Sequence, residues 1–247
     1  MAVSLPKGTP ENQKPGFLFN THFILGTPSP LDTATIPDLL NPAPCRTTSR
    51  HLTSAPAIRR PYFCSEGDDC YSFVTTCRDS EYETRAYEPS MWVGSPVHPN
   101  EDRYRAVDRL RDYFNQKNVP GIQIERTVPL LTLYTSFGRN PTATMVYLML
   151  PRRFYSNPPI PRDTMLFLTP FPPMMVFVKT VGGWLTSLHQ KSQEMFEDLL
   201  RQAEPFLPNH FYTAEYNGPL TIFNRHNEIW YLSYDVPRCS ARFGRGS

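Results

Sequence analysis

The sequence has 247 residues, of which 40% are hydrophobic and 19% are charged, and its formal net charge is +2. This length fits one large domain or a domain with a tail. The small net charge argues against a nucleic-acid-binding groove, which needs clustered basic residues, and no apolar run reaches the roughly 18 residues that a membrane span needs.

The first 62 residues are predicted to form an extended arm. They hold ten of the 27 prolines and clusters of Ser and Thr, so they cannot bury enough apolar surface to fold alone. Residues 1–6 show no charged stretch followed by an apolar one, so we expect no signal peptide and a cytoplasmic location. Two apolar patches, at 17–25 and 36–40, are expected to dock on the domain itself or on a partner protein.

The five cysteines are an odd number, so at least one thiol stays unpaired in any disulfide scheme. Cys64 and Cys70 are close enough in sequence to close a short disulfide loop, but reduced thiols are the expectation in a cytoplasmic chain. The spacings are not those of a CxxC zinc site, so no metal site is predicted.

Several strands and one helix are predicted in the first half of the domain. The helix should begin after Pro99 with Asn100 as its N-cap, and it should end at 118–121, where Asn, Pro and Gly occur. Its apolar residues recur at helical spacing and should form one buried stripe: Ala106, Val107, Leu110, Tyr113 and Phe114. Residues of high β-propensity predict strands at 71–77, 82–87, 91–96, 122–124, 130–137 and 144–150.

The second half of the domain repeats this order of elements. A second helix should open at Gly182 and Gly183. The predicted strands around it are 165–169, 174–181, 211–216 and 228–234. The order of strands, helix and strands thus occurs twice, which predicts an α+β fold in which two half-sheets join into one curved antiparallel sheet with both helices packed on it.

Five motifs, in the same order, resemble the SOUL/heme-binding-protein family and most closely its heme-binding protein 2 branch. They are YETRAYEPSMWV at 82–93, RTVP at 126–129, LMLPRRFYSNPP at 148–159, YNGP at 216–219 and NRHNEIW at 224–230. Each motif alone is weak, and the resemblance comes from all five in one order. It does not cover the arm.

The resemblance implies a distorted antiparallel β-barrel built from two strand–helix–strand repeats, with two packed helices. It places this domain at 63–238, between the arm at 1–62 and a short basic tail at 239–247. It also implies that heme or a related porphyrin binds in an apolar site near the first helix. Trp92 and Trp230 lie on strands that pair the two ends of the fold, so both should be buried.

A heme site needs apolar walls, cationic groups for the propionates and, in some proteins, a His, Cys or Met on the iron. Near the first helix, Met91 and Val107 are candidates for the walls. Arg105 and Arg109 are candidates for pairing with propionates. His98 is the histidine nearest to the helix in sequence.

Each of these assignments has a simpler alternative. Met91 would be a core residue, His98 a residue of a surface loop, and the arginines a solvated helix face with local pairs such as Asp102–Arg105. Some relatives have a histidine in the opening strand as the proposed iron ligand, and the matching position here is Ala86. We therefore expect heme binding to be weak and to lack a strong protein ligand on the iron.

No G-x-S-x-G, Walker or H-E-x-x-H motif occurs, so no catalytic residue is predicted and we expect a protein that is not an enzyme. Two functions stay open. The first is a carrier of heme or porphyrin. The alternative is an interaction protein of a larger assembly, such as a cytoskeletal or ciliary one, anchored by residues 1–62.

Overall fold

The computed structural model describes residues 61–67, 69–135, 141–184, 187–218 and 220–238. Residues 1–60 of the predicted arm and the predicted tail at 239–247 lie outside the described residues. The strands are β1 (Asp69–Cys70), β2 (Phe73–Arg78), β3 (Glu83–Tyr87), β4 (Ser90–Pro96), β5 (Thr127–Val128), β6 (Leu130–Thr135), β7 (Thr142–Met149), β8 (Phe167–Phe171), β9 (Met174–Gly182), β10 (His210–Glu215) and β11 (His226–Leu232). The helices are α1 (Arg103–Phe114) and α2 (Leu188–Arg201), and two short 3-10 helices are η1 (Tyr62–Cys64) and η2 (Arg152–Phe154).

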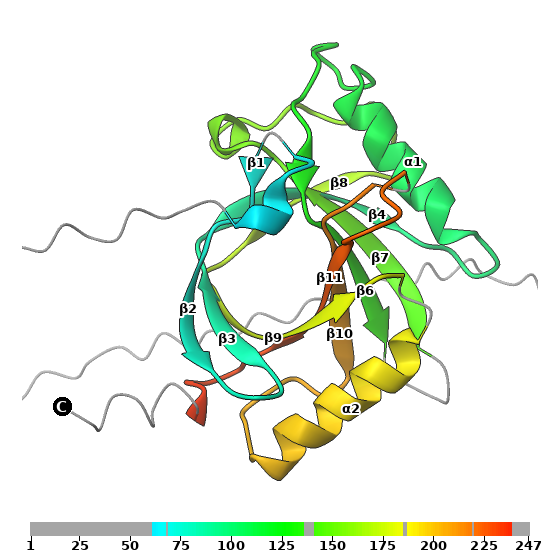
Figure 1. The fold of residues 1–247 in the computed structure, drawn as a ribbon. Coiled ribbons are helices and arrows are strands. Elements are labelled where there is room, and N and C mark those ends of the chain that lie inside the picture. The colour runs from blue at the N-terminus through cyan, green and yellow to red at the C-terminus, as the bar shows by residue number, and fades with distance from the viewer. Residues whose placement is uncertain (1–60, 68, 136–140, 185–186, 219, 239–247) are drawn as a thin grey trace, which may run out of the picture. The chain divides into compact units, whose positions relative to one another are not determined.

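Nine strands of the described chain form one sheet, in the order β2-β3-β9-β11-β10-β6-β7-β4-β8. All of its neighbouring strands run antiparallel. The sheet curls into an open barrel with α1 and α2 on its outer surface (Figure 1). β1 and β5 pair separately, in parallel.

The order of strands is nearly symmetric about the β6–β10 pair. On one side follow β7 and β4, with α1 between β4 and β6 in the chain, and on the other follow β11 and β9, with α2 between β9 and β10. β8 pairs with β4 and β3 pairs with β9, so each half adds a strand to the other half. The predicted α+β barrel of two strand–helix–strand repeats is confirmed.

Side chains alternate between the inner and outer faces of each strand, so the barrel has cores on both faces. Trp92 and Trp230 lie in the inner core and are fully buried, which confirms the prediction for both. Their neighbours point outward: Val93 packs with Leu110 of α1, and Ile229 belongs to the core beneath α2.

α1 is shorter than predicted at both ends. Asp102, rather than Asn100, is its N-cap, and the Asp102 carboxylate accepts a hydrogen bond from the Tyr104 N–H at 3.0 Å. The helix ends at Phe114, and Gln116 beyond it has a φ of +70°, the left-handed conformation that commonly ends helices. The predicted apolar stripe is buried along its whole length.

One predicted strand is wrong, and the second helix begins later than predicted. Residues 122–124 do not form the predicted strand, and within them only Gln123 forms an isolated β-bridge, with Asn115. The Asn118 side chain holds a turn here, because it accepts a hydrogen bond from the Ile122 N–H and donates one to the Ile122 carbonyl. α2 begins at Leu188 rather than near Gly182, because β9 extends through Gly182.

A disulfide bond joins Cys64 and Cys70, so the expectation of reduced thiols is wrong for this pair. η1 and the turn after it bring the chain back on itself and leave the two Cα atoms 5.9 Å apart, within the range that a disulfide needs. No helix in the described part of the chain is long and apolar enough to span a bilayer.

Candidate functional site

A pocket of about 560 Å³ lies beside α1, and we call it the α1 groove. One side of α1 forms its first wall, with Arg103, Val107 and Arg111 stacked a turn apart. The segment 126–130, which contains β5, forms a second wall, and the loop that joins β10 to β11 forms a third. In Figure 1 this loop, drawn in orange, lies between α1 and β1.

The inner surface of the groove is largely apolar. Val107, Phe114 and Val128 are buried, and Leu130 and Leu148 are partly buried. Val107 and Phe114 come from α1, Leu130 and Leu148 come from the outer face of the sheet, and Val128 comes from β5. The volume of the groove lies within the range that is typical of sites for small molecules and cofactors.

Arginines add positive charge to the groove. The Arg103 guanidinium donates to Glu215 at 2.6 Å and to the Thr132 hydroxyl at 2.9 Å, so its charge is neutralised within the groove. Arg111 pairs with Asp108 at 3.0 Å in an exposed position, where such pairs are weak. Arg126 is exposed on the wall that precedes β5.

Two groove-lining residues carry buried polar atoms without a hydrogen-bond partner in the described structure: Nε of Arg225 and Oδ1 of Asn227. The two residues are 7% and 1% exposed. An unsatisfied buried polar group costs on the order of 1–3 kcal/mol, so an unpaired donor and acceptor on one wall favour a polar ligand there.

The rest of the Arg225 guanidinium holds the β10–β11 loop. Its terminal nitrogens donate to the carbonyls of Asn217, Gly218 and Thr221 at 3.1, 2.6 and 2.9 Å. The guanidinium also lies 4.2 Å from the ring centre of Trp184, at the edge of the groove.

The structure does not bring the five predicted site residues together. Val107 lines the groove, whereas Met91 packs against the core beneath α1. His98 is exposed before the helix, and Arg105 is exposed and is not among the groove-lining residues. Arg109 points elsewhere, because it donates to the Ser95 hydroxyl at 2.9 Å and forms an ion pair with Glu101.

The local pair expected between Asp102 and Arg105 is replaced by other contacts. Asp102 caps the helix, and Glu101 pairs with Arg109 at 2.5 Å. Hydrogen bonds from Arg109 lower the pKa of Glu101 to about 2. The arginines of α1 therefore have different roles, which the spacing alone did not reveal.

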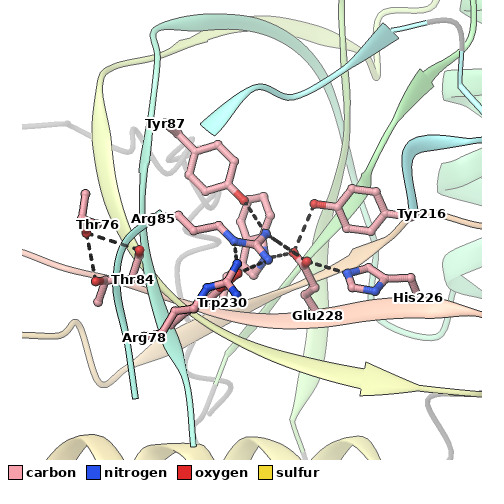
Figure 2. Close-up of polar contacts among 10 residues, drawn as sticks. Thr76, Arg78, Thr84, Arg85, Tyr87, Tyr216, His226, Glu228 and Trp230 are labelled. Atoms are coloured by element: carbon pink, nitrogen blue, oxygen red, sulfur yellow. Dashed lines mark hydrogen bonds and ion pairs between the residues drawn. The ribbon is translucent and has the colours of Figure 1, made fainter. Parts of the chain in front are cut away.

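Inside the barrel lies a second polar cluster, which sequence reasoning missed (Figure 2). Arg85 on β3 and Glu228 on β11 form an ion pair at 2.9 Å, with side chains only 3% and 0% exposed. Glu228 also accepts hydrogen bonds from Trp230 Nε1 at 2.7 Å and from the Tyr216 hydroxyl at 3.1 Å, and His226 Nε2 lies 2.6 Å from its other oxygen. We call these five residues the interior network.

The interior network is closed and internally satisfied. Burial raises the pKa of Glu228, but the hydrogen bond from His226 and the charge of Arg85 together lower it by more. The strand period could have revealed the cluster, because Arg85 shares a face with Tyr87, and Glu228 shares one with Trp230. Tyr216 is the one member of the network that lines the α1 groove, and we assign the network a structural role.

The chain is similar in sequence to proteins that bind heme. Residues 68–232 match the model of the SOUL heme-binding protein family. The chain is 30% identical over 167 residues to heme-binding protein 2 of Homo sapiens, covering 63% of this chain and 80% of that protein. It is 23% identical to heme-binding protein 1 of Bos taurus, covering 62% and 83%.

The chain belongs to the SOUL heme-binding protein family. The family match spans both strand–helix–strand repeats and stops short of the described C-terminus. Solved structures are more distant: the C-terminal domain of EcmrR is 13% identical with a TM-score of 0.47, covering 63% of this chain and 99% of that chain. An uncharacterized conserved protein from Listeria innocua is 11% identical with a TM-score of 0.45, covering 62% and 92%.

Ala86, the position at which the sequence resemblance led us to consider an iron ligand, lies in β3. It pairs in register with Val74 of β2 and Met175 of β9. None of these residues lines the α1 groove. Ala86 and the groove are therefore separate places on this chain.

The apolar walls and the cations of the groove match the chemistry of a tetrapyrrole, whereas for the iron its described lining offers tyrosines. None of the described residues that line it is a His, Cys or Met. Tyr216, one of its tyrosines, has a pKa well above 10 because it is fully buried and faces Glu228, so it stays protonated. No group of His, Cys, Asp and Glu in the described chain is arranged to hold a metal ion.

Proposed function

We propose that this protein binds tetrapyrroles in the α1 groove, with affinity for metal-free porphyrin as well as for heme. The observation that carries the proposal is the pairing of an apolar surface with unsatisfied polar atoms of Arg225 and Asn227 in one pocket. A porphyrin has the matching chemistry, because its flat ring is apolar and its two propionates are anionic. The relatives' names, heme-binding proteins 1 and 2, support the same ligand class.

In this proposal, Val107 and its apolar neighbours contact the ring, and the propionates lie near the arginines of the walls. Arg225 Nε donates to a carboxylate at the buried end, and Arg111 and Arg126 attract the other carboxylate at the open end. Of the residues predicted from sequence, the proposal keeps Val107 and leaves Arg105 and Arg109 outside the site. Met91 supports the wall from beneath α1.

The affinity for a tetrapyrrole then depends more on the buried area of the porphyrin ring than on ligation of the heme iron. Burial contributes about 25 cal/mol per Å² of apolar surface, and exposed propionate–arginine pairs add at most about 1 kcal/mol each. Because no His, Cys or Met of the described chain lines the groove, hemin binding should be weak and should not give a low-spin, strongly ligated spectrum.

The test is a comparison of hemin and protoporphyrin IX on the full chain, by absorbance and by fluorescence titration. We expect dissociation constants within about fivefold of each other, since less than ~1 kcal/mol would come from iron. The variant H98A should leave the hemin spectrum unchanged. A sharp low-spin spectrum that H98A abolishes would contradict the proposal, as would binding of hemin alone.

The alternative is a non-catalytic interaction protein held in a larger assembly by its proline-rich arm. It rests on the composition of residues 1–62 and on Ala86. If neither tetrapyrrole binds the full chain, this alternative is favoured, and pull-downs with residues 1–62 as bait become the next test.

A further inference from the structure

The side chain of Glu66 lies in the loop that the Cys64–Cys70 disulfide closes, and it reaches across to the β10–β11 loop. Its Oε1 accepts hydrogen bonds from Asn217 Nδ2 at 2.8 Å and from the Thr221 hydroxyl. Its Oε2 accepts one from the Gly218 N–H at 2.6 Å. Three donors from a distant part of the chain therefore converge on one carboxylate.

This contact acts on a wall of the α1 groove, because Asn217 and Gly218 line it. Arg225 holds the same loop by the carbonyls of Asn217, Gly218 and Thr221. Glu66 thus takes the loop's donors and Arg225 takes its acceptors. If Glu66 leaves, three donors of the loop lose their acceptor and one of the loop's anchors is gone, so we expect the position of Arg225 in the groove to change with it.

The same disulfide-closed loop also touches the second wall of the groove. β1 pairs with β5, with Asp69 opposite Thr127 and Cys70 opposite Val128. At Gly67 a Cβ atom would lie 3.0 Å from Val128 Cγ2, so the loop packs directly on this wall. Thr127 and Val128 both line the groove.

The surroundings of Glu66 favour the ionised form of its carboxyl group. Burial raises the pKa of its carboxyl group, but hydrogen bonds from Thr221, Gly218 and Asn217 and the nearby charge of Arg126 lower it by more. The carboxylate is therefore ionised at neutral pH, and hydrogen bonds to ionised groups are the stronger ones.

We propose that Glu66 is a positioning residue for the α1 groove and that the Cys64–Cys70 disulfide holds it in place, so that reduction of the disulfide weakens tetrapyrrole binding. This inference rests on the proposed function of the groove. Reduction by an external dithiol adds two electrons and two protons, breaks the S–S bond to give two thiols, and leaves the dithiol as its own disulfide. The freed loop then no longer fixes Glu66 against Asn217 and Gly218.

The experiment uses the full chain and two readouts. Hydrogen exchange of residues 217–225 without ligand reports on the loop, and protoporphyrin IX titration reports on the groove. Protoporphyrin IX is the probe because a thiol reductant would ligate the iron of hemin. The variants are Glu66→Ala, Glu66→Gln and the double variant Cys64→Ser with Cys70→Ser. The control is Glu88→Ala, because Glu88 is exposed and its ion pair with Arg152 is 3.8 Å long.

We expect Glu66→Ala to speed exchange in 217–225 and to raise the dissociation constant about tenfold, equivalent to ~1.4 kcal/mol. Glu66→Gln keeps one of the two acceptor oxygens and should give an intermediate value. Dithiothreitol should raise the dissociation constant of the unmodified protein to a similar degree. It should have no further effect on the double cysteine variant, which should already bind weakly. Glu88→Ala should change neither readout.

Two results would overturn the inference: unchanged exchange in Glu66→Ala, or tetrapyrrole affinity that neither Glu66→Ala nor reduction alters. If the unmodified protein binds no tetrapyrrole, the proposed function fails, while the exchange readout still tests the link between Glu66 and the loop. If Glu66→Ala does not fold, Glu66→Gln and the reductant arm on unmodified protein decide the question.

Discussion

Arg85 and Glu228 form an ion pair 2.9 Å long in the barrel interior, although they lie on strands that are not neighbours. β3 and β11 both flank β9, so the two side chains meet above the strand between them. The ring of Phe73 lies 4.0 Å from the Arg85 guanidinium on another side. The pair links the strand that opens the first repeat to the strand that closes the second.

Removing Arg85 should destabilise the domain strongly, because Glu228 would keep its charge without its cationic partner. We expect Arg85→Met to lower the free energy of unfolding by about 3–5 kcal/mol, measured by urea denaturation at pH 7. The matched control is Arg78→Met, because Arg78 pairs with Glu83 in an exposed position and should cost at most about 1 kcal/mol. Equal losses in the two variants would contradict a structural role for the interior network.

The two buried tryptophans should each be essential to the core. Trp92→Ala or Trp230→Ala should cost about 3–5 kcal/mol in the free energy of unfolding, the usual loss for a large core aromatic. Trp184→Ala is the control, because Trp184 is 50% exposed. A loss below about 1 kcal/mol at both buried positions would contradict the strand assignment.

The Glu101–Arg109 pair should give a pH-dependent part of the stability. The pKa of Glu101 is lowered from 4.5 to about 2, so its contribution is fully present above pH 4.5 and is lost as the pH falls toward 2. The stability difference between the unmodified protein and Glu101→Gln should therefore be constant near neutral pH and shrink between pH 4.5 and 2. A difference that does not change over this interval would show that Arg109 leaves the carboxyl group unaffected.

The domain should fold without its arm, provided that the first turn of η1 is kept. Phe63 is buried and stacks on His226 with ring centres 3.9 Å apart, and Cys64 is fully buried. We expect residues 61–238 to unfold in one cooperative transition and residues 71–238 to be markedly less stable, measured by thermal denaturation. A molten product from 61–238 would contradict the domain boundary.

The sequence was enough to predict one curved antiparallel sheet with two packed helices, because β-propensity and the repeated order of elements can be read locally, and the family resemblance added the barrel. Trp92 beside Val93 and Ile229 beside Trp230 already separate the inner face from the outer face. The ends of α1 were predicted less well, because Asn100 and Asp102 are both good N-caps and the choice depends on tertiary contacts. The sequence could not decide whether Cys64 and Cys70 form a disulfide, because the spacing of two cysteines does not determine their redox state.

The candidate site was only partly predictable. The family resemblance pointed to the first helix, and one of the candidates there, Val107, lines the α1 groove. It did not indicate which side of the helix faces the pocket, because this depends on Arg109 pairing with Glu101. Arg225 and Asn227 were not among the predicted site residues, and only the folded chain brings them to the same wall.

The charge of the groove offers the most direct test of the account. Arg111→Glu and Arg105→Glu change the same charge on the same helix, but only Arg111 lines the groove. In titrations of the full chain with protoporphyrin IX at low and moderate salt, we expect Arg111→Glu to raise the dissociation constant at least about fivefold, equivalent to ~1 kcal/mol, and to reduce its dependence on salt. Arg105→Glu should bind as the unmodified protein does. Equal weakening by both variants, or weakening by Arg105→Glu alone, would contradict binding in the α1 groove.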